Sequence, residues 1–188
     1  LPMNGLTARL SLDLLALAPG QVLAVTGAAG AYGGYVVQLA KADGLTVIAD
    51  ASESDRALVE SLGADIVVPR GDGVAAEIRH RFPDGVDGLA DGSVQNHLVV
   101  DAVRDGGAFT SVRGWPGPDG GVRGITFTVT FVRDYAREQA RLDRLRQQVE
   151  AGAVTLRVAE VYPAERAADA HRRLEAGGTR GRCVISFD

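Results

Sequence analysis

Several features that mark common functional classes are scarce in this sequence of 188 residues. Its one cysteine, Cys183, cannot form an internal disulfide, so a reducing compartment is the simplest setting and we expect a cytoplasmic protein. One cysteine and three scattered histidines fit no zinc-ligand spacing, so no metal site is predicted. No apolar run approaches the length that spans a bilayer, so no membrane role is expected.

Excess positive charge is also absent. The sequence has 20 Lys and Arg against 24 Asp and Glu, a net charge of −4. Nucleic-acid-binding domains carry basic patches, whereas the arginines here are scattered among acids, so no nucleic-acid partner is predicted. The 46% hydrophobic and 23% charged content is typical of a globular domain with one sizeable core. The chain starts at Leu1 without a signal peptide, and we expect a fragment of a longer protein.

The most informative stretch is VLAVTGAAGAYGGYVVQLAK, residues 22–41. Its first four residues have the β-branched, apolar character of a buried parallel strand, and its last residues are apolar at helical spacing. A strand, a glycine turn and a helix in this order bind diphosphates, because the helix N-terminus offers unpaired amides and glycines permit close approach. The glycines are Gly27, Gly30 and Gly33, however, and this G-x-x-G-x-x-G spacing alone also fits tight packing without a ligand.

An acidic residue follows at the distance that dinucleotide binding requires. Residues 46–49 predict a second buried strand, and Asp50 ends it about twenty residues after Gly30. A carboxylate at that position accepts hydrogen bonds from the adenosine ribose hydroxyls. The alternative is that Asp50 only opens the loop before the next helix. The turn and the acid together favour a dinucleotide site.

Strand and helix patterns alternate along most of the chain. The predicted strands are 22–25, 46–49, 66–68, 86–90 and 108–112, and the predicted helices include 6–17 and 93–103. Short connections between alternating strands and helices predict an α/β fold, a doubly wound (Rossmann) and mostly parallel sheet with helices on both faces.

Residues 125–131, ITFTVTF, differ from the uniformly apolar strands before them. Ile, Phe, Val and Phe alternate with three threonines. One apolar and one polar face predict a strand at the edge of the sheet, from Ile125 to Phe131.

Several motifs resemble the zinc-free quinone oxidoreductase branch of the medium-chain dehydrogenase/reductase superfamily. They are Gly5-Leu-Thr-Ala8, Val25-Thr-Gly-Ala-Ala-Gly30, Gln38-Leu-Ala-Lys41, Ser61-Leu-Gly-Ala-Asp65 and the closing Gly181-Arg-Cys-Val-Ile. The resemblance implies that residues 1–154 form an NAD(P)-binding Rossmann domain with a lead-in helix at 1–17. Residues 155–188 would return to pack on an N-terminal domain with a chaperonin-10-like barrel, which is absent from this chain. The active-site cleft would lie between the two domains.

The resemblance also implies a function for the parent protein, an NAD(P)H-dependent and zinc-independent oxidoreductase. It would transfer hydride to a small quinone, enone or carbonyl acceptor, and this fragment alone would be inactive. The edge strand would pair with its copy to form a homodimer. No catalytic residue is assigned, because the three histidines lie among charged neighbours and Cys183 lies in the last predicted strand.

The resemblance implies a role for each loop. Backbone amides from Gly30 to Gly33 would hold the pyrophosphate, residues 111–113 would flank the nicotinamide ring, and Thr7 would lie near its far side. Tyr32 replaces a small aliphatic residue, so its ring either narrows access to the diphosphate or, as we prefer, packs beneath the turn. The predicted cofactor-binding residues are Thr7, Gly27, Gly30, Ala31, Tyr32, Gly33, Asp50, Ser52, Arg56, Arg70, Asp91, Ser111, Val112 and Arg113.

The sequence leaves the coenzyme form nearly balanced. The carboxylate of Asp50 would repel the 2′-phosphate of NADPH and slightly favours NADH. Ser52, Arg56 and Arg70 could instead supply a phosphate pocket.

Two alternatives to the oxidoreductase remain open. An S-adenosylmethionine-dependent methyltransferase also has a glycine turn and an acid after its second strand, but it closes its sheet with an antiparallel hairpin. A non-catalytic assembly module, pairing through the edge strand, could also coexist with coenzyme binding.

Overall fold

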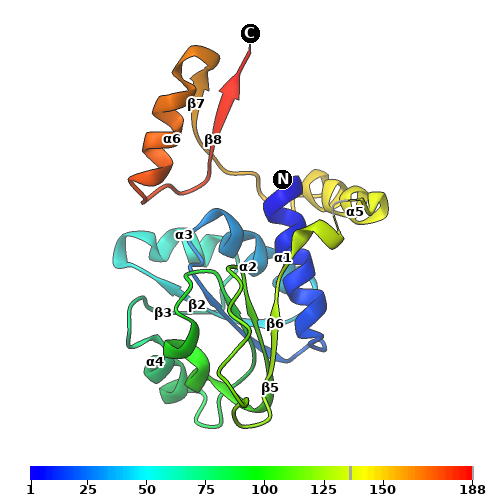
Figure 1. The fold of residues 1–188 in the computed structure, drawn as a ribbon, viewed down its shortest axis with the longest axis vertical. Helices are drawn as coiled ribbons and strands as arrows, with labels where there is room; N and C mark the ends of the chain where they lie inside the picture. Colours follow the sequence, from blue (N-terminus) through cyan, green and yellow to red (C-terminus); the bar gives the residue numbers. More distant parts are fainter. Residues whose placement is uncertain (136, 188) are drawn as a thin grey trace.

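The computed structural model describes residues 1–135 and 137–187 and contains a parallel six-stranded sheet (Figure 1). The strand order is β3-β2-β1-β4-β5-β6, and every neighbouring pair is parallel. The strands are β1 (Val22–Thr26), β2 (Thr46–Ala51), β3 (Ile66–Pro69), β4 (Val86–Asp91), β5 (Val103–Ser111) and β6 (Thr126–Val129). This order is that of the doubly wound dinucleotide-binding sheet, so the predicted fold class is confirmed.

Helices cover both faces of the sheet. The helices of this part are α1 (Pro2–Leu15), α2 (Ala31–Ala42), α3 (Arg56–Ser61), α4 (Val74–Arg81) and α5 (Gln139–Glu150), whereas α6 (Ala167–Glu175) packs on the small C-terminal sheet. On one face, α1 and α2 pack against each other, with α2 over β1 and β2 and α1 over β4 and β5, and they bury Leu12 and Leu39 in one core. On the other face, α4 contributes Ile78 to a second core that includes Phe109 of β5. No helix among the described residues is both long and apolar enough to cross a lipid bilayer.

The helix predicted at 93–103 is wrong. A short 3-10 helix, η2 (Asn96–Ala102), stands in its place, and β5 already begins at Val103. Val94 and Asn96 have positive φ angles of 61° and 52°, and the Asn96 amide donates to the carboxylate of Asp91 at 2.6 Å. This tether to the end of β4 replaces the helical hydrogen bonds that the local sequence predicts.

The predicted edge strand lies at the edge of the sheet but is shorter than residues 125–131. β6 pairs with β5 from Thr126 to Val129, and the chain then enters η3 (Val132–Asp134). Phe127 packs with Phe109 and Trp115, with ring centroids 5.4–5.5 Å apart. This aromatic cluster places the glycine-rich loop before β6 against the sheet.

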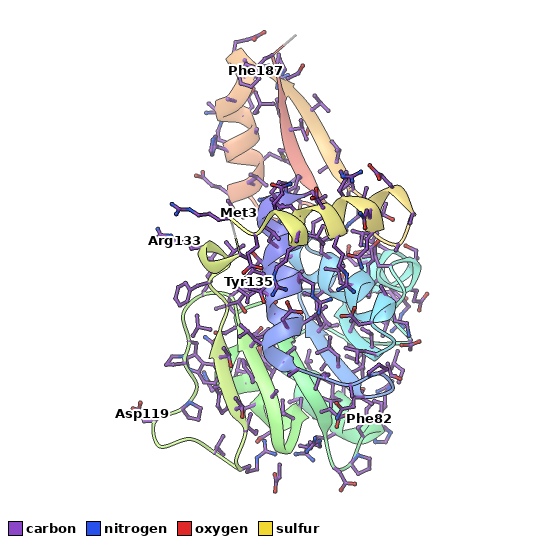
Figure 2. The ribbon with its side chains drawn as sticks, turned by 90° about the vertical axis from the view of Figure 1, so that its right-hand side faces the viewer. Met3, Phe82, Asp119, Arg133, Tyr135 and Phe187 are labelled. Carbon is purple, nitrogen blue, oxygen red and sulfur yellow. The ribbon has the colours of Figure 1, made fainter. Side chains whose placement is uncertain are left out.

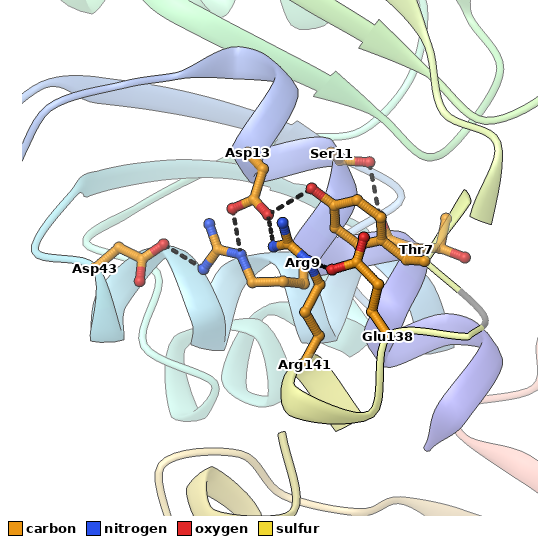
Figure 3. A network of polar contacts seen from close by, with 8 residues as sticks. Thr7, Arg9, Ser11, Asp13, Asp43, Glu138 and Arg141 are labelled. Atoms are coloured by element: carbon orange, nitrogen blue, oxygen red, sulfur yellow. Dashed lines mark hydrogen bonds and ion pairs between the residues drawn. The ribbon is translucent and has the colours of Figure 1, made fainter. Parts of the chain in front are cut away.

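A charged network joins α1 to the ends of α2 and α5 (Figure 3). Arg9, whose side chain is 11% exposed, donates to Asp13 at 2.8 Å and to Asp43 at 2.5 Å. Asp13 also accepts from Arg141 at 2.5 Å and from the Tyr135 hydroxyl at 2.9 Å. Both carboxylate oxygens of Asp13 therefore have partners, and the network holds the lead-in helix in place beside the sheet.

The C-terminal part forms a separate βαβ unit above the central sheet in Figure 1. β7 (Val158–Pro163) and β8 (Arg182–Ser186) form a parallel two-stranded sheet, with η4 (Ala164–Arg166) and α6 between them. We call residues 158–186 the terminal unit. Figure 2 shows Phe187 at the far tip of this unit, where its side chain is 86% exposed.

Candidate functional site

The turn between β1 and α2 has the geometry of a phosphate-binding loop. Gly27 adopts a φ of +66°, and its carbonyl accepts the amide of Gly30 at 2.9 Å. A Cβ atom on Gly33 would lie 2.4 Å from the Gly27 oxygen, so only glycine fits there. The Gly30 amide is used within the turn, which leaves the first helical amides, those of Ala31, Tyr32 and Gly33, without intrahelical acceptors. These three amides can bind an anion.

A polar cleft of about 260 Å³ opens at this turn, at the carboxyl ends of β1 and β2. Its lining residues are Gly27, Ala28, Ala29, Gly30, Asp50, Ala51, Ser52, Asp55, Arg70, Gly92, Ser93 and Arg180. We call it the turn cleft. It brings together Gly27, Gly30, Asp50, Ser52 and Arg70 from the predicted set.

Asp50 lies inside the turn cleft and is only 4% exposed. Its Oδ1 atom accepts the Ala28 amide at 3.1 Å. Burial raises the pKa of this carboxyl above its usual range, while the amides of Ala28 and Gly27 and the charge of Arg70 oppose the rise. The carboxylate therefore supports the turn from below and also faces the cleft.

Arg56 does not reach the turn cleft. Its guanidinium lies 3.6 Å from Glu53 and 3.6 Å from Glu60 on the surface of α3. These are solvent-exposed contacts that contribute little to stability.

The sequence prediction missed two charged residues of the turn cleft, Asp55 and Arg180. Arg180 donates from Nε and Nη2 to the two carboxylate oxygens of Asp55 at 2.6 and 2.7 Å. The Arg180 guanidinium holds the pKa of Asp55 below its usual range. The two residues are 125 positions apart, so no local pattern could have indicated the pair.

The sequence prediction also missed Arg157, which lies immediately before the terminal unit. It donates to the carbonyl oxygens of Ala29 at 3.0 Å and Gly30 at 2.7 Å. Burial lowers the pKa of its guanidinium, although the two carbonyls keep the charge hydrogen-bonded. The guanidinium fixes the backbone of the glycine turn and adds positive charge beside the amides that can bind an anion.

A second cleft of about 830 Å³ adjoins the first, and both are lined by Gly92 and Ser93. The other residues that line it are Met3, Asn4, Thr7, Tyr32, Val94, Val112, Arg113, Thr130, Phe131, Val132 and Arg133. We call it the wide cleft. It brings Thr7, Tyr32, Val112 and Arg113 together, and Figure 2 shows Met3 and Arg133 at this end of the sheet.

Tyr32 separates the two clefts without lying across the diphosphate turn. Its ring packs close to Gly92, where an added Cβ would lie 2.9 Å from the ring. Its hydroxyl is 2.7 Å from the Ser11 hydroxyl, which in turn is 3.0 Å from that of Thr130. Burial raises the pKa of Tyr32 well above its ordinary value. The ring therefore serves packing between α2, α1 and the end of β6.

Asp91 and Ser111, both in the predicted set, are buried structural residues beneath the clefts. Asp91 is 0% exposed and accepts the Thr26 hydroxyl at 2.6 Å, as well as amides of the following loop. The Ser111 hydroxyl donates to the Trp115 carbonyl at 2.8 Å. Neither side chain lines a cleft, so each would act by shaping a loop.

Within residues 1–135 and 137–187, no group of three or more His, Cys, Asp or Glu side chains could hold a metal ion. The parallel pairing of β5 with β6 also gives no antiparallel hairpin of the kind that closes a methyltransferase sheet. The arrangement can therefore bind a dinucleotide across the end of the sheet, with its reacting ring in the wide cleft.

The strand order and the turn cleft define this part of the chain as a Rossmann-type α/β domain. Residues 62–185 match the model of the zinc-binding dehydrogenase family, and the chain belongs to that family. The resemblance to the medium-chain dehydrogenase/reductase superfamily is thereby confirmed.

Three known proteins illustrate the relationship. The chain is 29% identical over 98% of its length to 2-methylene-furan-3-one reductase of Solanum lycopersicum, covering 45% of that protein. It is 30% identical over 88% of its length to the chloroplastic NADPH-dependent alkenal/one oxidoreductase of Arabidopsis thaliana, covering 40% of it. The solved structure of a quinone oxidoreductase from Pseudomonas syringae pv. Tomato DC3000 superposes with a TM-score of 0.84 at 25% identity, over 98% of this chain and 62% of that one. The chain thus spans less than half the length of these two curated relatives.

Proposed function

We propose that this chain is the coenzyme-binding domain of an oxidoreductase that transfers hydride between NAD(P)H and an activated carbonyl compound. One observation carries the proposal: a polar turn cleft and a wide cleft meet at Gly92 and Ser93, over the carboxyl ends of β1 and β4. Dinucleotides in doubly wound sheets bind across this switch point in the strand order.

The residues divide the coenzyme between the two clefts. The amides of Ala31, Tyr32 and Gly33 would bind the pyrophosphate, and the turn cleft would hold the adenosine ribose beside Asp50 and Ser52. The nicotinamide would enter the wide cleft between Thr7 on one side and Val112 and Arg113 on the other. The coenzyme supplies the hydride, and the protein's part is to orient the ring and exclude water.

The acceptor proposed for the wide cleft is a small quinone or α,β-unsaturated carbonyl compound. Met3, Val94 and Phe131 give the cleft apolar surface, with Met3 64% and Phe131 61% exposed. A flat conjugated acceptor needs such a surface to lie against the nicotinamide ring. The names of the three relatives, two enone or alkenal reductases and a quinone oxidoreductase, support this class.

Exposed apolar residues support the proposed division at residue 154, with residues 155–188 returning to an N-terminal domain. Val158, Val161 and Val184 of the terminal unit are 56%, 59% and 39% exposed, and Phe187 beyond it is 86% exposed. Val161 and Val184 are neighbours across the two strands, and exposed apolar side chains that gather in this way mark a protein interface. We propose that it packs on the domain that completes the wide cleft, in a parent enzyme that works without zinc in the cytoplasm.

The isolated 188-residue chain is expected to bind a nicotinamide dinucleotide without catalysing turnover. The proposed pyrophosphate and ribose contacts all come from this chain, whereas part of the acceptor site would come from the second domain. Titration by nicotinamide fluorescence should show saturable binding, and a coupled assay with quinones and enones should show no reduction. Quinone reduction by this chain alone would contradict the proposed division of labour.

We also propose that the parent protein is a homodimer, paired through the free edge of β6. The Thr130 amide donates inward to the Ser111 carbonyl at 2.9 Å, so by alternation the Val129 amide faces the open edge. Val129→Pro removes that outward donor and should convert a dimer to a monomer in sedimentation velocity without loss of fold. Val129→Lys is a second test of the same strand edge. A monomeric wild type would refute the pairing.

A further inference from the structure

The adenosine end of the turn cleft has an unusual origin, because part of it comes from the C-terminal segment. Arg180 lies between α6 and β8 and reaches α3, where its guanidinium pairs with both oxygens of Asp55. Asp55 is 6% exposed and also accepts the Ser52 hydroxyl at 2.6 Å. The carboxylate is therefore fixed, and it holds the guanidinium in one orientation at the wall of the cleft.

The guanidinium of Arg180 keeps donors available for a ligand. An arginine has five N–H donors, and the pair with Asp55 uses two of them. Its Nη1 atom has no hydrogen-bond partner among the residues that the structure describes. The side chain is 33% exposed and lines the same cleft as Ser52 and Arg70.

Arg70 supplies a second cation at this end of the cleft. Its backbone amide donates to the Ala51 carbonyl at 2.9 Å, which places residue 70 at the carboxyl end of β3. Its side chain is exposed and makes no hydrogen bond or ion pair with another described residue. Two guanidinium groups thus line one end of the cleft, and guanidinium groups suit a phosphate dianion.

Asp50 opposes a phosphate less than its position in the sequence suggests. One of its oxygens accepts the Ala28 amide, and the side chain is buried beneath the glycine turn. The charge of Arg70 acts on the same carboxylate. The slight preference for NADH drawn from the sequence weighed Arg70 against Asp50 but did not include Arg180, the second cation at this end of the cleft.

We propose that Arg180, oriented by Asp55 and assisted by Arg70, binds the 2′-phosphate of NADPH and makes it the preferred coenzyme. The proposal rests on the proposed function, because it assigns one subsite of the same coenzyme cleft. It makes the C-terminal segment a determinant of coenzyme choice as well as a route to the second domain. Arg180 is a specificity residue here, and Asp55 is a positioning residue.

The test measures binding of NADPH and NADH to the 188-residue chain and to three variants. Arg180→Gln should weaken NADPH roughly tenfold or more, since it removes hydrogen bonds between charged groups, and leave NADH within about twofold. Arg180→Lys keeps the positive charge without the planar guanidinium. Its affinity for NADPH should lie between those of wild type and Arg180→Gln. Arg172→Gln is the matched control, because that arginine is 69% exposed on α6 and its side chain pairs only with Asp169 among the residues that the structure describes. It should change neither affinity.

Two fragments of the coenzyme isolate the subsite. Adenosine 2′,5′-bisphosphate should bind wild type more tightly than AMP, and Arg180→Gln should erase the difference. If Arg180→Gln weakened NADPH and NADH binding equally, and Arg180→Lys restored neither, Arg180 would serve only to hold the C-terminal segment to Asp55. That result would overturn the inference. Tighter binding of NADH than NADPH by wild type would overturn it as well. Failure of every coenzyme and fragment to bind would instead overturn the proposed function.

Discussion

Gly33→Ala is expected to abolish measurable dinucleotide binding and to destabilise the domain. The new methyl carbon would lie 2.4 Å from the Gly27 oxygen and 2.8 Å from the Cα of Ala28, both backbone atoms that cannot rotate away. Relief of that overlap requires α2 to move away from the turn, which misplaces the amides of Ala31 and Tyr32. Overpacking of this kind costs about 1–3 kcal/mol of folding free energy. Chemical denaturation and coenzyme titration measure the two effects on one sample.

A matched control is available at another helix start. Gly73 is the N-cap of α4, has a φ of −83°, and an added Cβ there would have no atom within 4 Å. Gly73→Ala should therefore leave stability within about 0.5 kcal/mol of wild type and coenzyme affinity unchanged. If Gly33→Ala behaved like Gly73→Ala, the glycine turn would not be the pyrophosphate site.

Asp91→Ala is expected to cause the largest loss of stability among single substitutions beneath the clefts. The carboxylate is fully buried and accepts the Thr26 hydroxyl and the Asn96 amide, each at 2.6 Å, and the Ser93 amide at 3.2 Å. Its removal leaves these donors unsatisfied, at a combined cost of about 3 kcal/mol or more. The loop that lines both clefts would lose its anchor, so coenzyme affinity should fall together with the denaturation midpoint.

Asp101→Ala is the control for this substitution. Asp101 lies in η2, in the segment that follows β4. Its side chain is 87% exposed, and its one ion pair among the described residues is with Arg123 at 3.5 Å. The substitution should change stability by less than about 0.5 kcal/mol. Thr26→Val removes one donor to Asp91, so a double-mutant cycle with Asp91→Ala should show strong coupling. Additive effects would contradict the geometry at the end of β4.

Local signals explain which parts of the fold could be predicted. The glycine turn, the buried strands and the acid after β2 each depend on residues within a short window, and the structure contains these elements close to the predicted positions. The error at 93–103 depends on a long-range contact, because Thr26 of β1 donates to Asp91, whose carboxylate also captures the amides of the next loop. The strand predicted at 108–112 also begins earlier, at Val103, so Gly106 and Gly107 lie inside β5. The Cβ of an alanine at 107 would meet Val103 at 2.6 Å.

The candidate site was predictable only where one segment builds it. Arg157 lies 127 residues from its partner Gly30, whose backbone carbonyl it binds. Arg180 lies 125 residues from its partner Asp55, whose carboxylate it binds. Neither partner carries a sequence signature of the contact. Arg56, in contrast, is next in sequence to the cleft residue Asp55, but its guanidinium forms ion pairs with Glu53 and Glu60. Charge near a site in sequence is therefore a weaker indicator than the direction in which the side chain points.

These two arginines also change the expected role of the C-terminal segment. A boundary at residue 154 would assign Arg157 and Arg180 to the part that packs on another domain. The structure instead places both at the glycine turn or the turn cleft, through hydrogen bonds of 2.6–3.0 Å. The segment that leaves the sheet therefore contributes to the surface on which the coenzyme would bind.

The most direct test of the central proposal is an amide chemical-shift titration of the ¹⁵N-labelled chain with NADPH. We expect the largest shifts at Ala31, Tyr32 and Gly33, with a second group at Ser52 and Arg180 and a third at Arg113. Saturation of all three groups with one dissociation constant would show that a single dinucleotide lies across both clefts. Shifts confined to another surface, such as the Arg9 and Arg141 network, or no shifts at millimolar coenzyme, would contradict the account.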